Sequence, residues 1–330
     1  MCASKRGINA LNTAHGVFLD LGSVDNGDLD RGRLERSLDT WDWHDYTAQE
    51  ARADRLAGAH VAVTNKCVLD RDLLAASAEL KLVVVAATGT NNIDLDAARA
   101  SGVTVCNSRD YATASLTQHV MTLMLNLLTA QPFYARRVRS GDWSRARQFA
   151  LIDLPIREAQ GLNFGVVGHG VLGQAAARAA RALGMNVLVA ERKGRKPRPD
   201  HLPFEDVVAH ADVLSIHCPL TEETRNLFDR ATLQRMKRSA ILINTARGGI
   251  VNELDLASSL RDGIIAGAGV DVLSQEPPPA DHPLLAPDIP NLIVTPHNAW
   301  ASRRARQALL DQIATTIRAY ARGQPVNRIC

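Results

Sequence analysis

Residues 163–173 read Asn-Phe-Gly-Val-Val-Gly-His-Gly-Val-Leu-Gly, and this stretch decides the fold of the 330-residue chain. Its first half is a short apolar run of the kind that parallel sheets bury, and a helical pattern follows its last glycine. Gly168, Gly170 and Gly173 therefore form G-x-G-x-x-G between a strand and a helix. The first glycine allows a tight turn, the second lets backbone approach a pyrophosphate, and the third permits close helix–strand packing. The stretch predicts a unit that binds a dinucleotide, whose phosphates the helix N-terminus attracts.

An acidic residue, Glu191, follows the next predicted strand, where such proteins place an acceptor for the adenosine ribose hydroxyls. A carboxylate there repels a 2′-phosphate and favours NAD. The residues after it are strongly basic, however, and Arg192 and Lys193 could clamp that phosphate instead or simply form a solvated turn. We therefore expect NAD and leave NADP open. The basic residues of this run are Arg192, Lys193, Arg195, Lys196 and Arg198.

Short apolar runs alternate with amphipathic stretches along nearly the whole chain. This pattern predicts an α/β protein with doubly wound parallel sheets. Length and strand number together indicate two domains. The helical stretch that begins near residue 112 should end or kink at Pro132, and residues 148–158 should form an irregular connector. The candidate strands are residues 16–19, 60–64, 81–86, 103–106, 163–167, 186–190, 213–217, 240–244, 265–270 and 292–295, and the candidate helices include 70–77, 94–101, 171–183, 253–261 and about 300–322.

Composition excludes several classes of protein. Apolar residues make up 46% and charged residues 22%, as in a soluble globular protein, and the net charge of +3 is too small to indicate a nucleic-acid partner. The five cysteines are scattered without C-x-x-C spacing, which favours reduced thiols over disulfides or a metal site. The start lacks a signal peptide, and the longest apolar stretch, 116–128, falls short of the roughly 20 residues that span a membrane. We expect a cytoplasmic protein with no membrane partner.

Several strand ends carry polar residues that packing does not explain. Arg247 follows a strand and precedes two glycines, where its guanidinium could grip a carboxylate and a carbonyl oxygen together. His297 is suited to proton transfer near neutral pH, and Glu276 could fix its tautomer and favour the imidazolium. Taken alone, a histidine after Thr-Pro is more often structural, and Glu276 followed by two prolines would be part of a loop. Together they are typical of hydride transfer between a nicotinamide and a 2-oxo acid.

Eight motifs in one order resemble the D-isomer-specific 2-hydroxyacid dehydrogenases, and within them the glycerate dehydrogenase (hydroxypyruvate reductase) branch. The resemblance runs from about residue 60 to the C-terminus. Its motifs are residues 87–94, 106–113, 118–120, 168–173, 217–221, 244–249, 269–277 and 295–302. Departures from the family pattern are few: Asn298 replaces an apolar residue, and His169 stands where larger apolar residues are common.

The resemblance implies a role for each matching position. Arg247 orients the substrate, Glu276 is the acidic partner, and His297 is the general acid and base. Thr88, Gly89 and Thr90 match the loop whose backbone N–H groups hold the substrate carboxylate. The remaining positions match cofactor contacts: Val171 and Leu172 at the pyrophosphate, Glu191 at the ribose, Asp271 near the nicotinamide carboxamide, and Cys218, Pro219, Thr245 and Ala246 along the cofactor cleft.

The family also implies a layout that composition does not show. A Rossmann cofactor domain, 108–297, would be inserted into a flavodoxin-like substrate domain, 1–107 and 298–330, with hinge closure between them. Homodimers are common, and residues 112–139 would be either a dimerisation element or intradomain core. The expected reaction interconverts hydroxypyruvate and D-glycerate. The alternatives are a broad glyoxylate or 2-oxo-acid reductase that prefers NADP, and a dinucleotide-sensing binding protein like the corepressors that share this fold.

Overall fold

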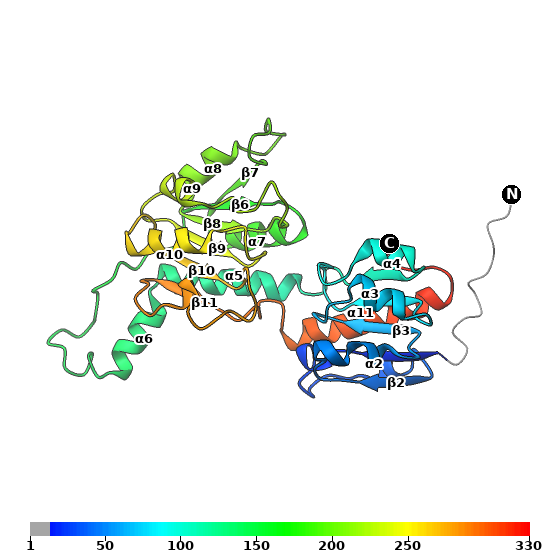
Figure 1. Cartoon of the computed structure of the whole chain (residues 1–330). Coiled ribbons are helices and arrows are strands. Elements are labelled where there is room, and N and C mark those ends of the chain that lie inside the picture. Colours follow the sequence, from blue (N-terminus) through cyan, green and yellow to red (C-terminus); the bar gives the residue numbers. More distant parts are fainter. Residues whose placement is uncertain (1–13) are drawn as a thin grey trace. The chain divides into compact units, whose positions relative to one another are not determined.

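The computed structural model describes residues 14–330, which form two compact units (Figure 1). Unit 1 contains the described residues up to Ala112 together with Ala301–Cys330, and unit 2 is Thr113–Trp300. The chain therefore leaves unit 1, builds the whole of unit 2, and returns to complete unit 1 with its last helix. Each unit is built around one parallel sheet.

The sheet of unit 1 has the strand order β2-β1-β3-β4-β5, which is the flavodoxin-like order. Its central strands β3 and β4 are buried along their whole length, as their continuous apolar sequences predict. Asp70 and Asp94 cap two of the helices by accepting hydrogen bonds from backbone N–H groups three residues ahead. The strands are β1 His15–Phe18, β2 Thr40–Trp43, β3 Val61–Thr64, β4 Leu82–Val85 and β5 Thr104–Asn107; the helices are α1 Gly32–Glu35, α2 Arg52–Leu56, α3 Arg71–Ala76, α4 Leu95–Ala100 and α11 Arg303–Ala321, with short 3₁₀ turns η1 Leu21–Ser23 and η2 Gln49–Ala51.

The ten predicted strands are all present, and each observed boundary lies within two residues of the predicted one. Strand β2 was missed. It lies at the edge of its sheet and alternates exposed and half-buried residues, so it lacks the continuous apolar run of its neighbours. Trp41 and Trp43 supply its buried side, with ring centroids 4.8 Å apart.

The sheet of unit 2 has the order β11-β10-β9-β8-β6-β7, with a parallel bridge from Ala190 to Leu202 beyond β7. Because β7 and β8 lie on opposite sides of β6, the chain switches direction at β6, and ligands of such sheets bind at the carboxyl end of that point. One face of the sheet is covered by α5 and α7, the other by α8, α9 and α10. The strands are β6 Asn163–Val167, β7 Asn186–Ala190, β8 Val213–Ile216, β9 Ile241–Asn244, β10 Gly267–Val270 and β11 Leu292–Val294; the helices are α5 Thr113–Leu128, α6 Gln131–Arg139, α7 Val171–Ala182, α8 Phe204–His210, α9 Arg230–Gln234 and α10 Glu253–Arg261, with η3 Pro283–Leu285.

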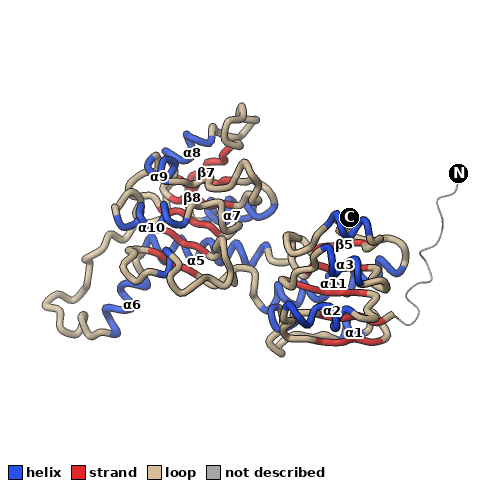
Figure 2. Tube along the Cα trace, in the orientation of Figure 1, coloured by secondary structure: helices blue, strands red, loops and turns tan. Residues whose placement is uncertain are grey.

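The predicted break at Pro132 is confirmed. Helix α5 ends at Leu128, Ala130 takes a left-handed conformation with φ +51°, and Pro132 lies in the first turn of α6. The predicted connector 148–158 contains no helix or strand. Together, residues 131–158 form an arm that extends away from the rest of unit 2, with its long loop shown in tan (Figures 1 and 2).

The described residues can be compared with the predictions for membrane-spanning helices, metal-binding clusters and cysteines. None of their helices combines the length and apolarity that crossing a membrane requires. Within residues 14–330, no group of three His, Cys, Asp or Glu side chains is arranged to hold a metal ion. Four cysteines, Cys67, Cys106, Cys218 and Cys330, are free thiols, and Cys2 lies outside the described residues.

Candidate active site

The glycine loop after β6 leaves room for backbone contacts and for a ligand. Gly168 has φ +96°, and a Cβ there would lie 2.6 Å from the backbone nitrogen of Cys218, closer than side chains tolerate. A Cβ on Gly173 would overlap the carbonyl oxygen of Gly168, so this glycine lets α7 pack against the turn. Gly170 instead faces open space, with nothing within 4 Å of the Cβ position. The first and third glycines thus close the turn, and the second keeps its surface accessible.

Polar groups around this turn also fit a dinucleotide. No side chain caps the N-terminus of α7, and within the described chain the backbone N–H groups of Val171 and Leu172 have no acceptor. The hydroxyl of Thr245, at the end of β9, is buried without a hydrogen-bond partner among the described residues. Such groups are costly unless a ligand or water satisfies them. Burial raises the pKa of the Cys218 thiol to about 11, so Cys218 lines this region in its neutral form.

Glu191 lies at the end of β7, as predicted, but its carboxylate is engaged by Arg198. Arg198 donates from Nε at 2.6 Å and from Nη2 at 3.3 Å, and the backbone N–H of Arg192 donates at 2.8 Å. The Arg198 hydrogen bond lowers the pKa of Glu191 to about 2, so the carboxylate is ionised. Of the two residues that could clamp a phosphate, Arg192 contributes its backbone N–H here, and the ammonium of Lys193 lies 5.8 Å from the ring centroid of Phe204.

Arg247 follows β9, and its guanidinium is available for a ligand. The side chain of Asn244 shapes the turn by accepting from the Ala246 N–H at 3.1 Å and donating to the Arg247 carbonyl at 3.0 Å. The Arg247 guanidinium donates to the Ala246 carbonyl and forms no ion pair with a carboxylate among the described residues. A half-buried cation without a counterion is suited to binding an anion.

Glu276 and His297 meet, although 21 residues separate them. Nδ1 of His297 lies 2.6 Å from Oε2 of Glu276, and the other carboxylate oxygen accepts from the Leu273 N–H at 2.9 Å. An ionised carboxylate only accepts, so Nδ1 donates and Nε2 is the nitrogen available to a reacting group. Both side chains are partly exposed, at 27% and 31%. The pair can therefore pass a proton to or from a ligand.

A second acid, Asp271, holds the turn that carries His297. Its carboxylate, 1% exposed, accepts from the hydroxyl of Thr295 at 2.5 Å and from the N–H groups of Asn298 and Ala299 at 3.0 Å each. These donors lie on both sides of His297, whose backbone has a left-handed φ of +52°. Nε2 of His119, from α5, lies 3.0 Å from the Thr295 hydroxyl. Sequence reasoning gave His119 no role, although a histidine in the most apolar stretch of the chain was a usable signal.

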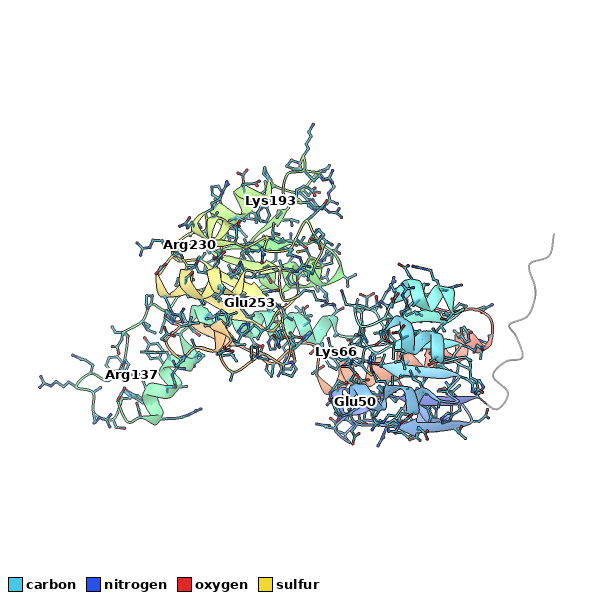
Figure 3. All side chains as sticks on the ribbon, in the orientation of Figure 1. Glu50, Lys66, Arg137, Lys193, Arg230 and Glu253 are labelled. Carbon is cyan, nitrogen blue, oxygen red and sulfur yellow. The ribbon has the colours of Figure 1, made fainter. Side chains whose placement is uncertain are left out.

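A third acid, Glu253, fixes the loop that carries Glu276. Glu253 is the first residue of α10 and is labelled in Figure 3. It accepts from the N–H and the hydroxyl of Ser274, both at 2.6 Å, and Nε2 of the buried His282 lies 3.0 Å away. Nδ1 of His282 accepts from the Leu284 N–H, so Nε2 carries the proton that Glu253 accepts. Nothing in the sequence indicated this cluster.

The loop predicted to hold the substrate carboxylate lies in unit 1, after β4. Asn107 donates to the Thr88 carbonyl at 2.7 Å, and the Thr88 hydroxyl donates to the Ser108 carbonyl at 3.0 Å. Within residues 14–330, the backbone N–H groups of Gly89 and Thr90 have no acceptor. The other predicted site residues lie in unit 2, at or just after the carboxyl ends of its strands.

Known proteins share this architecture. Residues 121–299 match the family model described as the NAD binding domain of D-isomer specific 2-hydroxyacid dehydrogenases. A glycerate dehydrogenase of Methylorubrum extorquens is 43% identical over 306 residues, which cover 91% of this chain and 96% of the relative. A hydroxypyruvate reductase of Blautia hydrogenotrophica is 32% identical over 317 residues, which cover 94% and 98%. The TT0316 protein from Thermus thermophilus has a TM-score of 0.84 at 32% identity, with 96% of this chain and all of that chain covered.

The nucleotide-binding sheet and its glycine loop point to the dinucleotide-dependent oxidoreductases as the class. Within that class, the chain belongs to the D-isomer specific 2-hydroxyacid dehydrogenase family. It is an NAD-binding enzyme that acts on 2-hydroxy or 2-oxo acids.

Proposed function

We propose that this enzyme interconverts hydroxypyruvate and D-glycerate with the NADH/NAD pair. The observation that carries the proposal is the Glu276–His297 pair, with Nδ1 engaged and Nε2 available, in the unit that also bears the unpaired Arg247. The glycerate dehydrogenase and hydroxypyruvate reductase relatives support the choice of substrate.

In the proposed mechanism, Arg247 binds the substrate. Its planar guanidinium donates two parallel hydrogen bonds, one to the carboxylate and one to the carbonyl oxygen at C2. The bond to the carbonyl oxygen stabilises the negative charge that develops there during reduction. We propose that the backbone N–H groups of Gly89 and Thr90 are suited to binding a carboxylate, because they have no acceptor within the described chain.

His297 supplies the proton. Nε2 donates to the substrate oxygen, which becomes the hydroxyl of the product, and the ring is left neutral with Nδ1 still bonded to Glu276. Glu276 orients the ring and balances its positive charge before the transfer. NADH, held by the cofactor-binding groups given in the next paragraph, would supply the hydride that C2 receives. In the oxidation direction, Nε2 accepts the hydroxyl proton instead.

Cofactor contacts are proposed for the groups that the structure leaves open. The N–H groups at the start of α7 are suited to the pyrophosphate, and the orphaned hydroxyl of Thr245 is suited to a polar group of the cofactor. Glu191 is suited to the ribose, in competition with Arg198. The set proposed to hold the cofactor is Gly168, Gly170, Val171, Leu172, Gly173, Glu191, Cys218, Pro219, Thr245 and Ala246. Asp271 is proposed instead to position the turn that carries His297, because its carboxylate is already engaged by Thr295, Asn298 and Ala299.

A steady-state comparison of hydroxypyruvate, glyoxylate, pyruvate and one larger 2-oxo acid, each with NADH and NADPH, tests the substrate. We expect the highest kcat/KM for hydroxypyruvate. His297→Ala should lower kcat by about 10²–10⁴-fold, as the loss of a general acid does. If kcat/KM is higher for glyoxylate than for hydroxypyruvate, the enzyme is a glyoxylate reductase and the proposed substrate is wrong. Dinucleotide binding without turnover of any 2-oxo acid would instead favour the corepressor-like alternative.

We further propose a substrate-binding role for unit 1, a cofactor-binding role for unit 2, and a homodimer formed through the arm 131–158. The arm exposes large apolar side chains: Phe149 is 92% exposed, Ile152 81% and Ile156 57%. Several large apolar side chains exposed within one short segment are typical of a surface that binds a partner. Helix α5, by contrast, packs Val120, Leu123, Met124 and Leu128 into the core of unit 2. Analytical ultracentrifugation of Phe149→Glu with Ile152→Glu should show a monomer, and an unchanged mass would contradict the assignment.

A further inference from the structure

Of the basic residues after β7, Arg198 is the one whose side chain contacts Glu191 at the end of that strand. The chain turns after Glu191, with a hydrogen bond from the Arg195 N–H to the Arg192 carbonyl, and returns so that Leu202 pairs with β7. This return brings Arg198 back beside Glu191, seven residues earlier. Two other basic residues of this run contact groups other than Glu191. The ammonium of Lys193 lies over the ring of Phe204, and Nη2 of Arg195 lies 3.8 Å from Oε1 of Glu223.

Arg198 saturates the carboxylate that would otherwise bind the ribose. Oε2 of Glu191 accepts from Nε and from the backbone N–H of Arg198, and Oε1 accepts from Nη2 of Arg198 and from the N–H of Arg192. A carboxylate has about four acceptor positions, and all four are used here. Glu191 therefore accepts from the ribose hydroxyls only when Arg198 releases at least one oxygen.

The ion pair between Glu191 and Arg198 also reduces the electrostatic repulsion between this site and a 2′-phosphate. An unpaired carboxylate at this position excludes a 2′-phosphate, because like charges would lie side by side without solvent between them. With Arg198 bound to it, the two side chains have no net charge. The Arg198 side chain is 64% exposed, whereas that of Glu191 is 5% exposed, so the arginine is the accessible member of the pair and the one that an incoming phosphate reaches.

We propose that Arg198 determines the cofactor specificity of this enzyme: by pairing with Glu191 it removes the repulsion of a 2′-phosphate and binds that phosphate itself, so that NADPH is accepted alongside NADH. The inference rests on the proposed cofactor site. It assigns the phosphate-binding role to the last residue of the basic run, and not to Arg192 or Lys193.

The test measures dinucleotide affinity directly, by titrating NADH and NADPH against the full chain without substrate and following nicotinamide fluorescence. Arg198→Ala should weaken NADPH binding by about 10- to 100-fold, as the loss of a charge-assisted hydrogen bond does, and should leave NADH binding unchanged or tighter. Arg195→Ala is the matched control, because it removes the same charge from the same run at a position facing Glu223. It should change NADPH affinity by less than about threefold, since exposed charges act weakly.

A double variant separates charge from geometry. Adding Glu191→Gln to Arg198→Ala should recover much of the lost NADPH affinity, because the unpaired carboxylate is then gone. The inference is overturned if Arg198→Ala weakens both cofactors equally, if Arg195→Ala has the same effect, or if the double variant binds NADPH no better than Arg198→Ala. Because these titrations need no turnover, they are independent of whether hydroxypyruvate proves to be the substrate.

Discussion

Replacing Gly248 by alanine should inactivate the enzyme, although Gly248 is not among the residues proposed to bind substrate or cofactor. A Cβ at Gly248 would overlap the carbonyl group of Leu273 and the nitrogen of Ser274 by about 1 Å or more, compared with the 3.4 Å at which ordinary contact begins. These are backbone atoms, so the loop must move as a unit. Glu276 lies two residues after Ser274 in this loop. A displacement of about 1 Å would break its 2.6 Å hydrogen bond to His297. A misplacement of about 1 Å costs about 10²-fold in rate, which sets the expected loss of kcat.

Gly249→Ala is the matched control for this substitution. A Cβ on Gly249 would meet only side-chain atoms at ordinary contact distance, the Leu220 methyl groups at 3.7 Å and Nη1 of Arg225 at 3.9 Å, and its φ of +78° should cost about 1–2 kcal/mol of stability. Gly248→Ala should cost a similar 1–3 kcal/mol through overpacking, so thermal unfolding does not distinguish the two variants, whereas kcat does. Adding Glu276→Gln to Gly248→Ala should lower kcat little further, because both changes remove the same contact. The reasoning fails if Gly248→Ala keeps kcat within about threefold of the parent, or if Gly249→Ala loses as much.

Three further changes test other parts of unit 2. Gly173→Ala places a Cβ on the Gly168 carbonyl, so NADH affinity should fall more than about tenfold in a fluorescence titration, and an unchanged Kd would remove the packing argument for the turn. Asp271→Asn leaves donors of the His297 turn unpaired, so kcat should fall about 10- to 100-fold while KM for the 2-oxo acid changes little; an effect on KM alone would argue against a positioning role. Burial lowers the pKa of His217 from 6.5 to about 4, so between these pH values the unfolded chain binds more protons than the folded one, and stability decreases as the pH falls, by up to about 3 kcal/mol. In urea unfolding at pH 7 and 4.5, His217→Asn should lose correspondingly less stability, and an equal loss would show that His217 does not contribute.

The parts of the fold that the sequence predicted well are those whose signal is local. Strand β6 and the start of α7 were predicted to the residue, because a doubly buried strand is apolar throughout and the glycines mark its end. Arg247, Glu276 and His297 were selected for a similar reason: each follows a strand, and the carboxyl ends of parallel strands lie along one edge of a sheet.

The parts that sequence reasoning missed depend on contacts between distant residues. His119 and Thr295 meet across 176 residues, and Glu253 and His282 across 29, so no spacing rule pairs them. Arg198 was overlooked for a related reason. Proximity in sequence favoured the two residues directly after Glu191, whereas the return of the chain beside β7 brings the seventh residue to the carboxylate.

The hydrogen bonding of unit 2 separates residues that position the site from residues that bind. Asp271 and Glu253 have their carboxylates filled by donors from neighbouring loops, so they stabilise the turns but have little capacity left for a ligand. Arg247 and Thr245 have the opposite character, since each is at least half-buried and lacks the ion-pair or hydrogen-bond partner that its burial requires. Substitutions in the first group should therefore lower kcat with ligand affinity retained, and substitutions in the second should weaken binding. Glu191 belongs to both groups, because its carboxylate is filled by a side chain that can leave, and this makes the Arg198 contact the point at which the site can choose between ligands.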